Sequence, residues 1–482
     1  MAGREPRTAN SSDLLVRPGS ARSWWLREAL GISSQRPAPT LGEHITSSVV
    51  IVGGGFTGLW TAYHLTERSP GLDIVLLEAD ICGGGASGRN GGLVTGWWDE
   101  LDRLVELFGP DEGIRLARAL GTAIQDIGAW CRTEGRDAWY RQDGYVATAT
   151  TPAQAASLRA AVDVASRWGV ADELYGLTAD EVRQRCDSPT FGAGFLMHDG
   201  ATVQPARLAR ALREVVLERG VRIFERTRVR EIREGPPTVM VENGSVRAEA
   251  AVLAVNAWAN QWPATRRFSV PRGSYMVLTE PLPDRLEQLG WTNGTCFTDG
   301  RTAVHYFRTT EDGRIAFGGG GASTGFGRSI GRTFTHDRRA AKRTADGFRR
   351  LFPTLSDVEL TDVWGGPIDV GPAHLPTFSR IGQGTVAAVG YTGNGVGPAM
   401  LGGRVISGMV LDVDDEWTTL PLVDFQPQRY PVDPMRSLGA WVINKAVVRR
   451  DVQDEVRGRV GPITNFMARL PARLGYSLPP DA

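Results

Sequence analysis

The sequence has few cysteines, few lysines and no long hydrophobic run. Its four cysteines are far apart in 482 residues and form no C-x-x-C pair, which argues against a disulfide framework and a cysteine zinc site. No run of 18 or more apolar residues occurs, and residues 1–45 lack the charged-then-apolar pattern of a signal peptide. We therefore expect a cytoplasmic protein with no integral membrane segment.

An excess of either charge is also missing. The 54 Lys and Arg residues balance the 54 Asp and Glu residues, so the basic stripe that a nucleic-acid partner requires is not expected. The histidines show no metal-ligand spacing with nearby acids, so no metal site is predicted. No G-x-S-x-G occurs to suggest a serine hydrolase.

Glycine, by contrast, is abundant. The chain has 59 glycines, about 12% of its residues against a usual ~7%, with no collagen period. A packed protein keeps glycines where its backbone must approach another backbone or a ligand closely. The length exceeds the roughly 250–300 residues that one core supports, so several domains are expected.

The first glycine cluster lies inside a strand–turn–helix–strand pattern. The apolar run 49–52 predicts a buried parallel strand, residues 56–68 a helix, and the apolar run 74–77 a second strand that ends at Glu78. Between the first strand and the helix, residues 53–58 read G-x-G-x-x-G. This motif is weak alone, but the strand before it, the helix after it and the acid 20 residues beyond it together predict a dinucleotide site.

Each residue of this motif has a distinct expected role. Gly53 makes the tight turn, Gly55 lets the backbone approach a pyrophosphate, and Gly58 lets the helix pack closely against the strand. The pyrophosphate is expected at the helix N-terminus, where free N–H groups and the helix dipole favour an anion. Glu78 is expected to accept hydrogen bonds from both ribose hydroxyls.

Two further glycine clusters point to a flavin rather than a nicotinamide dinucleotide. Residues 82–92 hold six glycines and can press N–H groups and Ser87 against a large, extended ligand. Residues 390–398 lie between the apolar strand 385–389 and a helix from about Pro398 to Leu411. That helix N-terminus suits the carbonyl edge of a flavin, which gains negative charge on reduction. The sequence therefore predicts bound FAD.

At these clusters the chain resembles the FAD-dependent D-amino-acid oxidase superfamily, which includes sarcosine, glycine and other amine oxidases. The resemblance covers residues 46–412, and the stretch 85–92 is most similar to γ-glutamylputrescine oxidase and its relatives. It implies oxidation of a C–N bond of a small amine or amino acid by hydride transfer to flavin N5, giving an imine that hydrolyses to a carbonyl product. Oxygen, giving hydrogen peroxide, or another acceptor would reoxidise FAD.

Expected FAD contacts come from the glycine clusters, from the acid and from two positions that the resemblance implies, Val229 at the adenine and Asn256. No Cys or His lies where relatives attach flavin covalently, so dissociable FAD is expected. The full set is Gly53, Gly55, Phe56, Thr57, Gly58, Glu78, Ala86, Ser87, Arg89, Asn90, Gly91, Gly92, Val229, Asn256, Gly393, Asn394, Gly395 and Val396.

The expected fold is α/β (α+β overall), with a Rossmann-like FAD-binding domain interleaved with a β-sheet substrate domain. The FAD-binding domain takes residues 46–96, 199–262 and 366–413, and the substrate domain takes residues 97–198 and 263–365. The resemblance implies that residues 263–365 form a β-sheet roof over the flavin. Residues 1–45 form an N-terminal extension with a flexible start and a short docking helix, and residues 414–482 form a helical tail.

Aromatic and basic residues of the roof are the catalytic candidates, although each also fits an ordinary core position. Aromatic and apolar walls exclude water and favour the unprotonated amine by desolvation. A substrate carboxylate would favour a bidentate arginine, for which Arg272 and Arg308 are candidates. The candidate catalytic residues are Tyr275, His305, Tyr306, Trp364 and Arg308.

Lysine is missing where oxygen-using relatives often hold one near flavin N5. The chain has only Lys342 and Lys445, and on the strand 314–320 Ala316 falls at about that position. We therefore expect substrate to reduce the flavin faster than oxygen reoxidises it, with Arg314 as a partial substitute if the register shifts. The last glycine loop has Asn394 where relatives often have His.

Two other functions stay open. An NAD(P)H-dependent flavin reductase or monooxygenase would need a second nucleotide fold, and residues 317–321 fail the G-x-G-x-x-G spacing. The second open function is that of a scaffold that binds a flavin without catalytic turnover. The sequence specifies neither the amine nor the oligomeric state.

One helix is predicted in the tail, over residues 435–450. Leu438, Trp441, Val442 and Ala446 lie on one face of it, and the polar side is basic. We expect the apolar face to pack on the protein, and contact with a membrane surface is the alternative.

Overall fold

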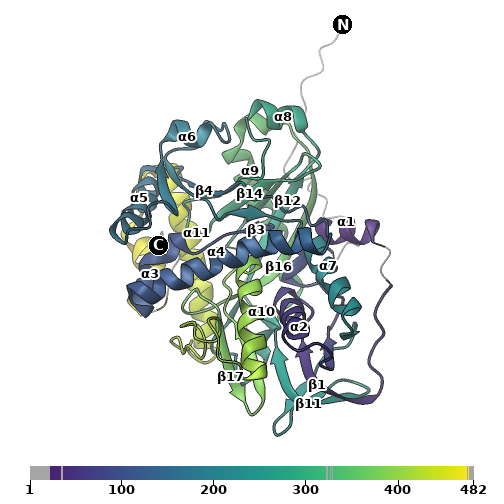
Figure 1. The fold of residues 1–482 in the computed structure, drawn as a ribbon. Coiled ribbons are helices and arrows are strands. Elements are labelled where there is room, and N and C mark those ends of the chain that lie inside the picture. The colour runs from purple at the N-terminus through teal and green to yellow at the C-terminus, as the bar shows by residue number, and fades with distance from the viewer. Residues whose placement is uncertain are drawn as a thin grey trace.

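The computed structural model describes residues 22–33, 36–321, 324–325, 327, 329–474 and 476, which are organised around two large β-sheets (Figure 1). The strands of the first sheet are β1 (His44–Val52), β2 (Ile74–Leu77), β8 (Arg222–Phe224), β9 (Glu231–Arg233), β10 (Thr238–Met240), β11 (Ser245–Leu253), β17 (Thr377–Gly382) and β18 (Thr385–Val389). Their order is β17–β18–β11–β1–β2–β8, and the five strands from β18 to β8 are parallel. β9 and β10 extend the sheet beside β11.

The second sheet is mainly antiparallel. Its strands are β4 (Tyr145–Thr148), β5 (Leu174–Leu177), β6 (Gly194–Met197), β12 (Val270–Thr279), β13 (Cys296–Asp299), β14 (His305–Thr309), β15 (Ile315–Gly319) and β16 (Leu360–Val370). They follow the order β16–β12–β15–β14–β13–β4–β6–β5. A separate pair, β3 (Leu93–Val94) and β7 (Ala201–Thr202), is also formed.

Helices cover the first sheet because its strands are apolar on both faces, as buried parallel strands must be. α2 (Phe56–Arg68) packs against α7 (Pro205–Glu218) and α10 (Val396–Leu411), and α10 also contacts the long α4 (Pro110–Thr133). Figure 1 shows α4 running across the molecule above α2 and α10. α2 and α10 approach closely because Gly403 has no side chain: a Cβ there would lie 2.6 Å from the Trp60 Cβ. The short α1 (Trp24–Ile32) docks on α7.

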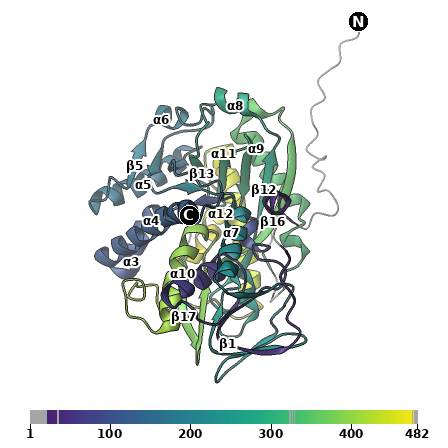
Figure 2. The ribbon, with the colours of Figure 1, turned by 45° about the vertical axis from the view of Figure 1, so that its right-hand side comes forward.

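Other helices flank the second sheet. α9 (Arg338–Leu351) packs on β12 and β15, and α5 (Pro152–Arg167) packs on β5 and β6. The C-terminal helices, yellow in Figure 1 and Figure 2, are α11 (Met435–Arg457), α12 (Pro462–Ala468) and α13 (Leu470–Arg473). The remaining helices are α3 (Leu101–Phe108), α6 (Ala179–Arg183) and α8 (Pro283–Gln288).

The predicted α/β class and the main predicted elements are confirmed. The strand 385–389 and the helix 56–68 have the predicted bounds, and the apolar segment around Trp25 forms α1 as predicted. The chain segments of the two sheets alternate along the sequence, although β16 crosses the predicted domain boundary at residue 365, and the domain boundaries stay a prediction. The flexible start predicted before α1 lies outside the described residues up to residue 21.

Three expectations need correction. The sequence analysis predicted no helix where α4 lies, and Val229, which is expected at the adenine, lies in the loop before β9. The predicted inward face of α11 is wrong: Leu438, Trp441 and Val442 are exposed. The residues that α11 buries include Arg436 and Asp451, because their polar groups bond to the body of the protein.

Within the ranges that the structure describes, no helix is both long enough and apolar enough to cross a membrane.

Candidate functional site

A cavity of about 1220 Å³ lies between the two sheets. It is lined by the glycine clusters at the carboxyl ends of β1, β2 and β18 and by residues of β4, β12, β13 and β14. Parallel α/β sheets bind ligands at the carboxyl ends of their strands, so this is the expected place for a dinucleotide. Of the eighteen residues predicted to contact FAD, sixteen line this cavity, and Gly58 and Gly92 do not.

The first turn depends on two glycines that a side chain would disrupt. Gly53 has φ +114°, and a Cβ there would lie 2.2 Å from the carbonyl oxygen of Ala254. A Cβ on Gly58 would lie 2.0 Å from the carbonyl oxygen of Gly53. Gly58 therefore sits behind the cavity wall and permits the close helix–strand packing that the sequence predicts.

Two helix N-termini face the cavity without a side-chain cap. α2 begins after Gly55 and α10 after Gly395, and neither helix has an acidic residue in its first turn. The Phe56 N–H donates to Ser87 Oγ at 2.9 Å, which ties the second glycine cluster to the first. Thr57 Oγ1 donates to the Tyr391 hydroxyl at 2.8 Å and ties the third cluster to the same helix. Both helix ends thus offer positive potential to an anionic or electron-rich ligand group.

Glu78 stands at the end of β2 with its carboxylate on the cavity wall. Oε2 accepts from the Gly54 N–H and Oε1 from the Asp80 N–H, both at 2.8 Å. Burial raises the pKa of the Glu78 carboxyl, while these two N–H donors lower it. Each carboxylate oxygen keeps a further lone pair that can accept from a ribose hydroxyl.

The second glycine cluster is held from behind by donors that the sequence analysis did not assign. Trp25 Nε1 donates to the Asn90 carbonyl at 3.0 Å, and Trp364 Nε1 donates to the Arg89 carbonyl at 2.8 Å. Ser23 Oγ donates to the carbonyl of Gly88. Helix α1 of the N-terminal extension thereby fixes the loop, since three consecutive carbonyls are satisfied by side chains. The two tryptophan rings lie edge to face, 5.9 Å apart.

Asp369 is a second residue that the sequence analysis missed. Its buried carboxylate accepts from the Gly390 N–H at 2.5 Å and from Asn256 Nδ2 at 2.7 Å. Burial raises the pKa of Asp369 to about 7. Asp369 therefore joins the third glycine cluster to Asn256, which lies on the cavity wall. No short motif surrounds Asp369, so only the folded chain identifies it.

The cavity wall contributed by the second sheet and by the 330–335 stretch is called the roof wall here. It comprises Tyr145, Ser274, Thr298, Val304, Tyr306, Gly320, Ile330, Gly331, Arg332, Phe334, Thr335, Gly366, Pro367 and Ile368. Two hydroxyl pairs cross it: Ser274 with Tyr306 at 2.7 Å and Tyr145 with Thr298 at 2.6 Å. Among the described residues of this wall, Arg332 is the only charged one. Burial raises the pKa of Tyr306 to about 12, so its hydroxyl is neutral at physiological pH.

Of the five predicted catalytic residues, only Tyr306 lines the cavity. Tyr275 neighbours Ser274 on β12 but points the other way, and its hydroxyl donates to the Thr333 carbonyl at 2.8 Å. His305 neighbours Tyr306 on β14 and pairs with Asp299, Nδ1 to Oδ2 at 2.6 Å, on the α9 side of the sheet. Successive side chains of a strand point to opposite faces, which separates these neighbours.

Trp364 and Arg308 lie behind the second glycine cluster instead of on the cavity wall. Arg308 is fully buried, donates to the carbonyls of Val203 and Thr309, and lies over the Trp25 ring. Burial lowers the pKa of Arg308 to about 9. The other arginine predicted for a carboxylate, Arg272, donates to Asn444 of α11 at 2.5 Å. Neither arginine is placed to meet a substrate.

The strand β15 presents no cation to the cavity. Ala316 is buried among α1 and β12 residues, and a Cβ on Gly318 would lie 2.0 Å from the Tyr306 ring. The register of β15 shows no shift, and Arg314 pairs with Asp312 at 2.7 Å, which excludes Arg314 as the substitute. No lysine is among the described residues that line the cavity.

The residues present fit FAD. The volume exceeds the roughly 300–1,000 Å³ of an ordinary small-molecule pocket, so a dinucleotide and a small substrate can be held together. The Oδ1 of Asn256 is buried without a hydrogen-bond partner among the described residues, which marks an acceptor for a ligand donor. The uncapped helix ends and the acid at β2 supply the donors and acceptor that pyrophosphate and ribose require.

Comparisons with known proteins identify the family of this chain. The model of the DAO family, described as FAD dependent oxidoreductase, matches residues 48–409. γ-Glutamylputrescine oxidoreductase of Escherichia coli is 30% identical over 423 residues, 86% of this chain and 95% of the relative. A probable oxidoreductase, OrdL, of Rhizobium meliloti is 28% identical over 79% of this chain and 87% of its own. Glycine oxidase from Bacillus cereus shares the fold, with a TM-score of 0.64 and 19% identity over 79% of this chain and 99% of that one.

Proposed function

The chain belongs to the DAO family of FAD-dependent oxidoreductases and is an enzyme of the amine and amino-acid oxidase type, and on this premise we propose that it oxidises a C–N bond of a small amine or amino acid. The substrate carbon loses a hydride and its nitrogen loses a proton, so the C–N bond becomes an imine. Water then hydrolyses the imine to a carbonyl compound and an amine or ammonia. FAD bound in the cavity supplies the hydride acceptor.

The glycine-rich half of the cavity would hold that cofactor. The N-terminus of α2 would receive the pyrophosphate, Glu78 the ribose hydroxyls, and the backbone at Val229 the adenine. The N-terminus of α10, behind residues 393–396, would face the flavin ring. Asp369 and Trp25 would keep the third and second glycine clusters in place without touching the cofactor.

The roof wall would hold the amine. It contains no carboxylate and no imidazole among its described residues, so no side chain there is placed to carry the amine proton. Desolvation against Val304, Phe334 and Ile330 favours the uncharged amine, whose proton goes to water on entry. The Tyr306 and Ser274 hydroxyls would orient its nitrogen by hydrogen bonds.

Arg332 supports a substrate with a carboxylate at the end remote from the reacting amine. It is the only charged residue among those that the structure describes on the roof wall, and a guanidinium pairs well with a carboxylate. The similarity to a relative named for γ-glutamylputrescine, a molecule with an amine at one end and a carboxylate at the other, supports the same class.

The observation that carries the proposal is one cavity in which three glycine clusters face a hydroxyl-bearing wall that has no carboxylate or imidazole among its described residues. The test is anaerobic mixing of the FAD-loaded protein with amines and amino acids. We expect the visible flavin absorbance to disappear without NAD(P)H. Bleaching only with NAD(P)H would instead indicate a reductase or monooxygenase, and no bleaching with either would indicate a scaffold.

A stopped-flow version of this mixing experiment, which follows both reduction and reoxidation of the flavin, addresses the electron acceptor. Because no lysine is among the described residues on the cavity wall, we expect reoxidation by oxygen to be slower than reduction by substrate. Reoxidation faster than reduction, with one peroxide per turnover, would refute this expectation.

Changing Tyr306 to phenylalanine is expected to slow flavin reduction about tenfold. The melting temperature of the protein is expected to change little. The change removes the hydroxyl that bonds to Ser274 on the roof wall, and a misplaced substrate costs more in rate than in affinity. Single-turnover reduction at saturating amine measures it. Tyr275→Phe is the matched control, since that hydroxyl bonds behind the sheet, and it is expected to lower the melting temperature but not the reduction rate. If both variants reduce the flavin equally slowly, Tyr306 does not contact the substrate.

A further inference from the structure

Helix α11 exposes a continuous stripe of side chains along one face. Residues at alternating three- and four-residue spacings are all exposed, namely Met435, Leu438, Val442, Lys445, Arg449, Val452 and Val456, with Trp441 beside them. This spacing follows one face of a helix, so the seven side chains share one surface. The stripe is apolar at both ends and basic in the middle.

Exposed large hydrophobic side chains are concentrated in this tail. The described part of the chain exposes thirteen of them, and ten lie between residues 432 and 474: Val432, Met435, Leu438, Trp441, Val442, Val452, Val456, Ile463, Phe466 and Leu474. Scattered single residues would need no explanation, but a concentration in one segment marks an interaction surface. α12, which carries Ile463 and Phe466, packs on α11, so the ten side chains belong to one structural unit.

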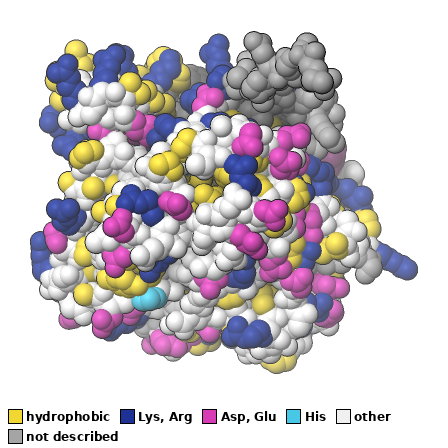
Figure 3. All heavy atoms as spheres, turned by 90° about the horizontal axis from the view of Figure 1, so that it is seen from above, with side chains coloured by type: hydrophobic (Ala, Val, Ile, Leu, Met, Phe, Trp, Pro, Cys, Tyr) yellow, Lys and Arg dark blue, Asp and Glu magenta, His cyan; other side chains and the backbone are white. Residues whose placement is uncertain are grey.

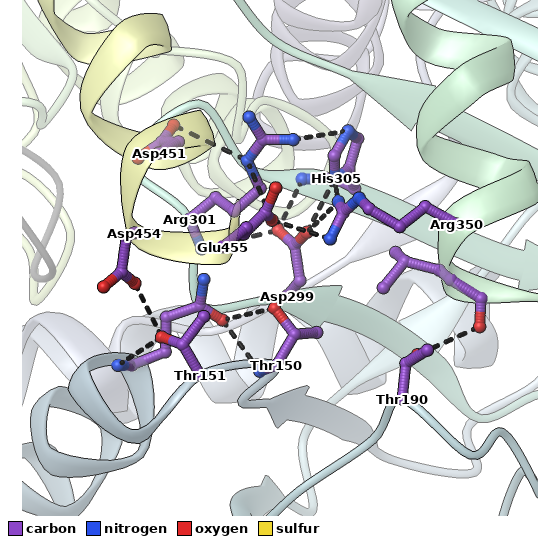
Figure 4. Close-up of polar contacts among 12 residues, drawn as sticks. Thr150, Thr151, Thr190, Asp299, Arg301, His305, Arg350, Asp451, Asp454 and Glu455 are labelled. Carbon is purple, nitrogen blue, oxygen red and sulfur yellow. Dashed lines mark hydrogen bonds and ion pairs between the residues drawn. The ribbon is translucent and has the colours of Figure 1, made fainter. Parts of the chain in front are cut away.

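The charges of the tail are sorted between its two sides. All three carboxylates of residues 435–474 face the protein (Figure 4): Asp451 accepts from the Ala303 N–H at 2.9 Å, Asp454 from Thr151 Oγ1 at 2.6 Å, and Glu455 pairs with Arg350 at 2.7 Å. Six cations of the same segment are exposed: Lys445, Arg449, Arg457, Arg459, Arg469 and Arg473. Over most of the face seen in Figure 3 the two signs are interspersed, so this sorting is not a general property of the surface.

A groove of about 590 Å³ runs beside the stripe, between α11 and the start of α9. Four cations border it, Arg343, Lys445, Arg449 and Arg457, against one carboxylate, Asp337. Lys445 also lies over the Trp441 ring at 3.7 Å, which places an aromatic side chain at the level of the cations.

We propose that the C-terminal tail of residues 432–474 docks the enzyme on the surface of an anionic lipid bilayer. The apolar side chains would enter the boundary between head groups and acyl chains, and the six exposed cations would meet the phosphates. An amphipathic helix with aromatic and aliphatic residues on its outer face and basic residues among them has the chemistry of an interfacial helix. The contact is peripheral, because no helix of the described chain is able to span a bilayer.

Charge complementarity favours a bilayer over a second copy of the chain. Two copies packed stripe to stripe would bring Lys445 and Arg449 against like charges, and the three carboxylates of residues 435–474 are held inward. Anionic head groups remove this repulsion. Docking does not depend on the proposed reaction, since none of these residues lines the FAD cavity.

The test is co-sedimentation of the FAD-loaded full chain with vesicles, without any substrate. We expect binding to vesicles of phosphatidylcholine with about a third phosphatidylglycerol, and at least tenfold weaker binding to phosphatidylcholine alone or at high salt. No binding, or equal binding to both lipids, would overturn the proposal. A tail-dependent dimer seen by light scattering in place of vesicle binding would assign the surface to a second copy and overturn it too.

Two variant pairs connect the binding to the tail. Lys445→Glu with Arg449→Glu, and separately Trp441→Ser with Val456→Ser, are each expected to weaken vesicle binding at least about tenfold. The controls place changes of the same kind elsewhere, at residues that are exposed outside the tail: Arg118→Glu with Arg247→Glu for the charge reversal, and the single change Ile32→Ser for the loss of an exposed apolar side chain. Unchanged FAD content and melting temperature show that each variant is folded. If the control variants lose vesicle binding, or if the tail variants keep it, the protein does not dock through this surface.

Discussion

Protein with Gly53 changed to alanine is expected to be isolated with less than about a tenth of the FAD of the wild type. Gly53 has φ +114°, a conformation that costs any other residue about 1–2 kcal/mol or more, and the new Cβ would lie 2.2 Å from the Ala254 carbonyl oxygen. The turn between β1 and α2 must then open, and the helix N-terminus moves away from the place where it would meet the pyrophosphate. FAD absorbance per chain after purification, and titration of the apoprotein with FAD, measure the loss.

Gly71→Ala is the matched control for this substitution. Gly71 also has a positive φ, +85°, but no atom lies within 4 Å of its Cβ position, so only the backbone cost of about 1 kcal/mol remains. This variant should keep its full FAD content with a slightly lower melting temperature. If Gly53→Ala binds FAD as tightly as Gly71→Ala, the turn at Gly53 is not the cofactor site.

Changing Glu78 to alanine is expected to raise the dissociation constant for FAD about 10- to 100-fold. Hydrogen bonds to a charged carboxylate contribute about 1.5–3 kcal/mol, and a tenfold change in affinity corresponds to 1.4 kcal/mol. The structure adds a second cost, because the Gly54 and Asp80 N–H groups lose the acceptor that they bond at 2.8 Å. Titration of apoprotein by flavin fluorescence quenching gives the affinity.

The conservative variant Glu78→Asp separates the effect of the negative charge from the effect of the reach of the side chain. It keeps the charge but reaches one methylene less far, so FAD binding should weaken by less than in Glu78→Ala. Glu242→Ala removes an exposed carboxylate remote from the cavity and should leave the affinity unchanged. Equal FAD affinity in the wild type and Glu78→Ala would show that the acid at the end of β2 has another role.

The glycine-rich half of the cavity was predictable because its signals are local. The residues from β1 through Gly53 and α2 to Glu78 form one continuous unit, and a positive φ or a close backbone approach restricts the choice to glycine. Sixteen of eighteen predicted contacts consequently line one cavity. The supports of that unit, Trp25 and Asp369, were not predictable, since their partners lie far away in the sequence.

The roof wall was less predictable for a different reason. The strands β12 and β14 are largely buried on both faces, so hydrophobic alternation does not show which side faces the cavity. Ser274 and Tyr306 line the cavity, while their neighbours Tyr275 and His305 point away. A candidate list drawn from residue types alone therefore includes residues on both faces of a strand, and only Tyr306 of the five candidates lines the cavity.

The sequence by itself determined the dinucleotide unit, the cofactor and the α/β class, because each rests on short patterns whose geometry is imposed by a few neighbouring residues. Only the tertiary structure decided the orientation of α11. Its amphipathic pattern favours burying Leu438 and Trp441, but partners on α9 and in the residues before β14 hold the polar side inward through Asp451 and Glu455. Ion pairs and hydrogen bonds between distant segments outweighed the local pattern, and the apolar side was left to face outward.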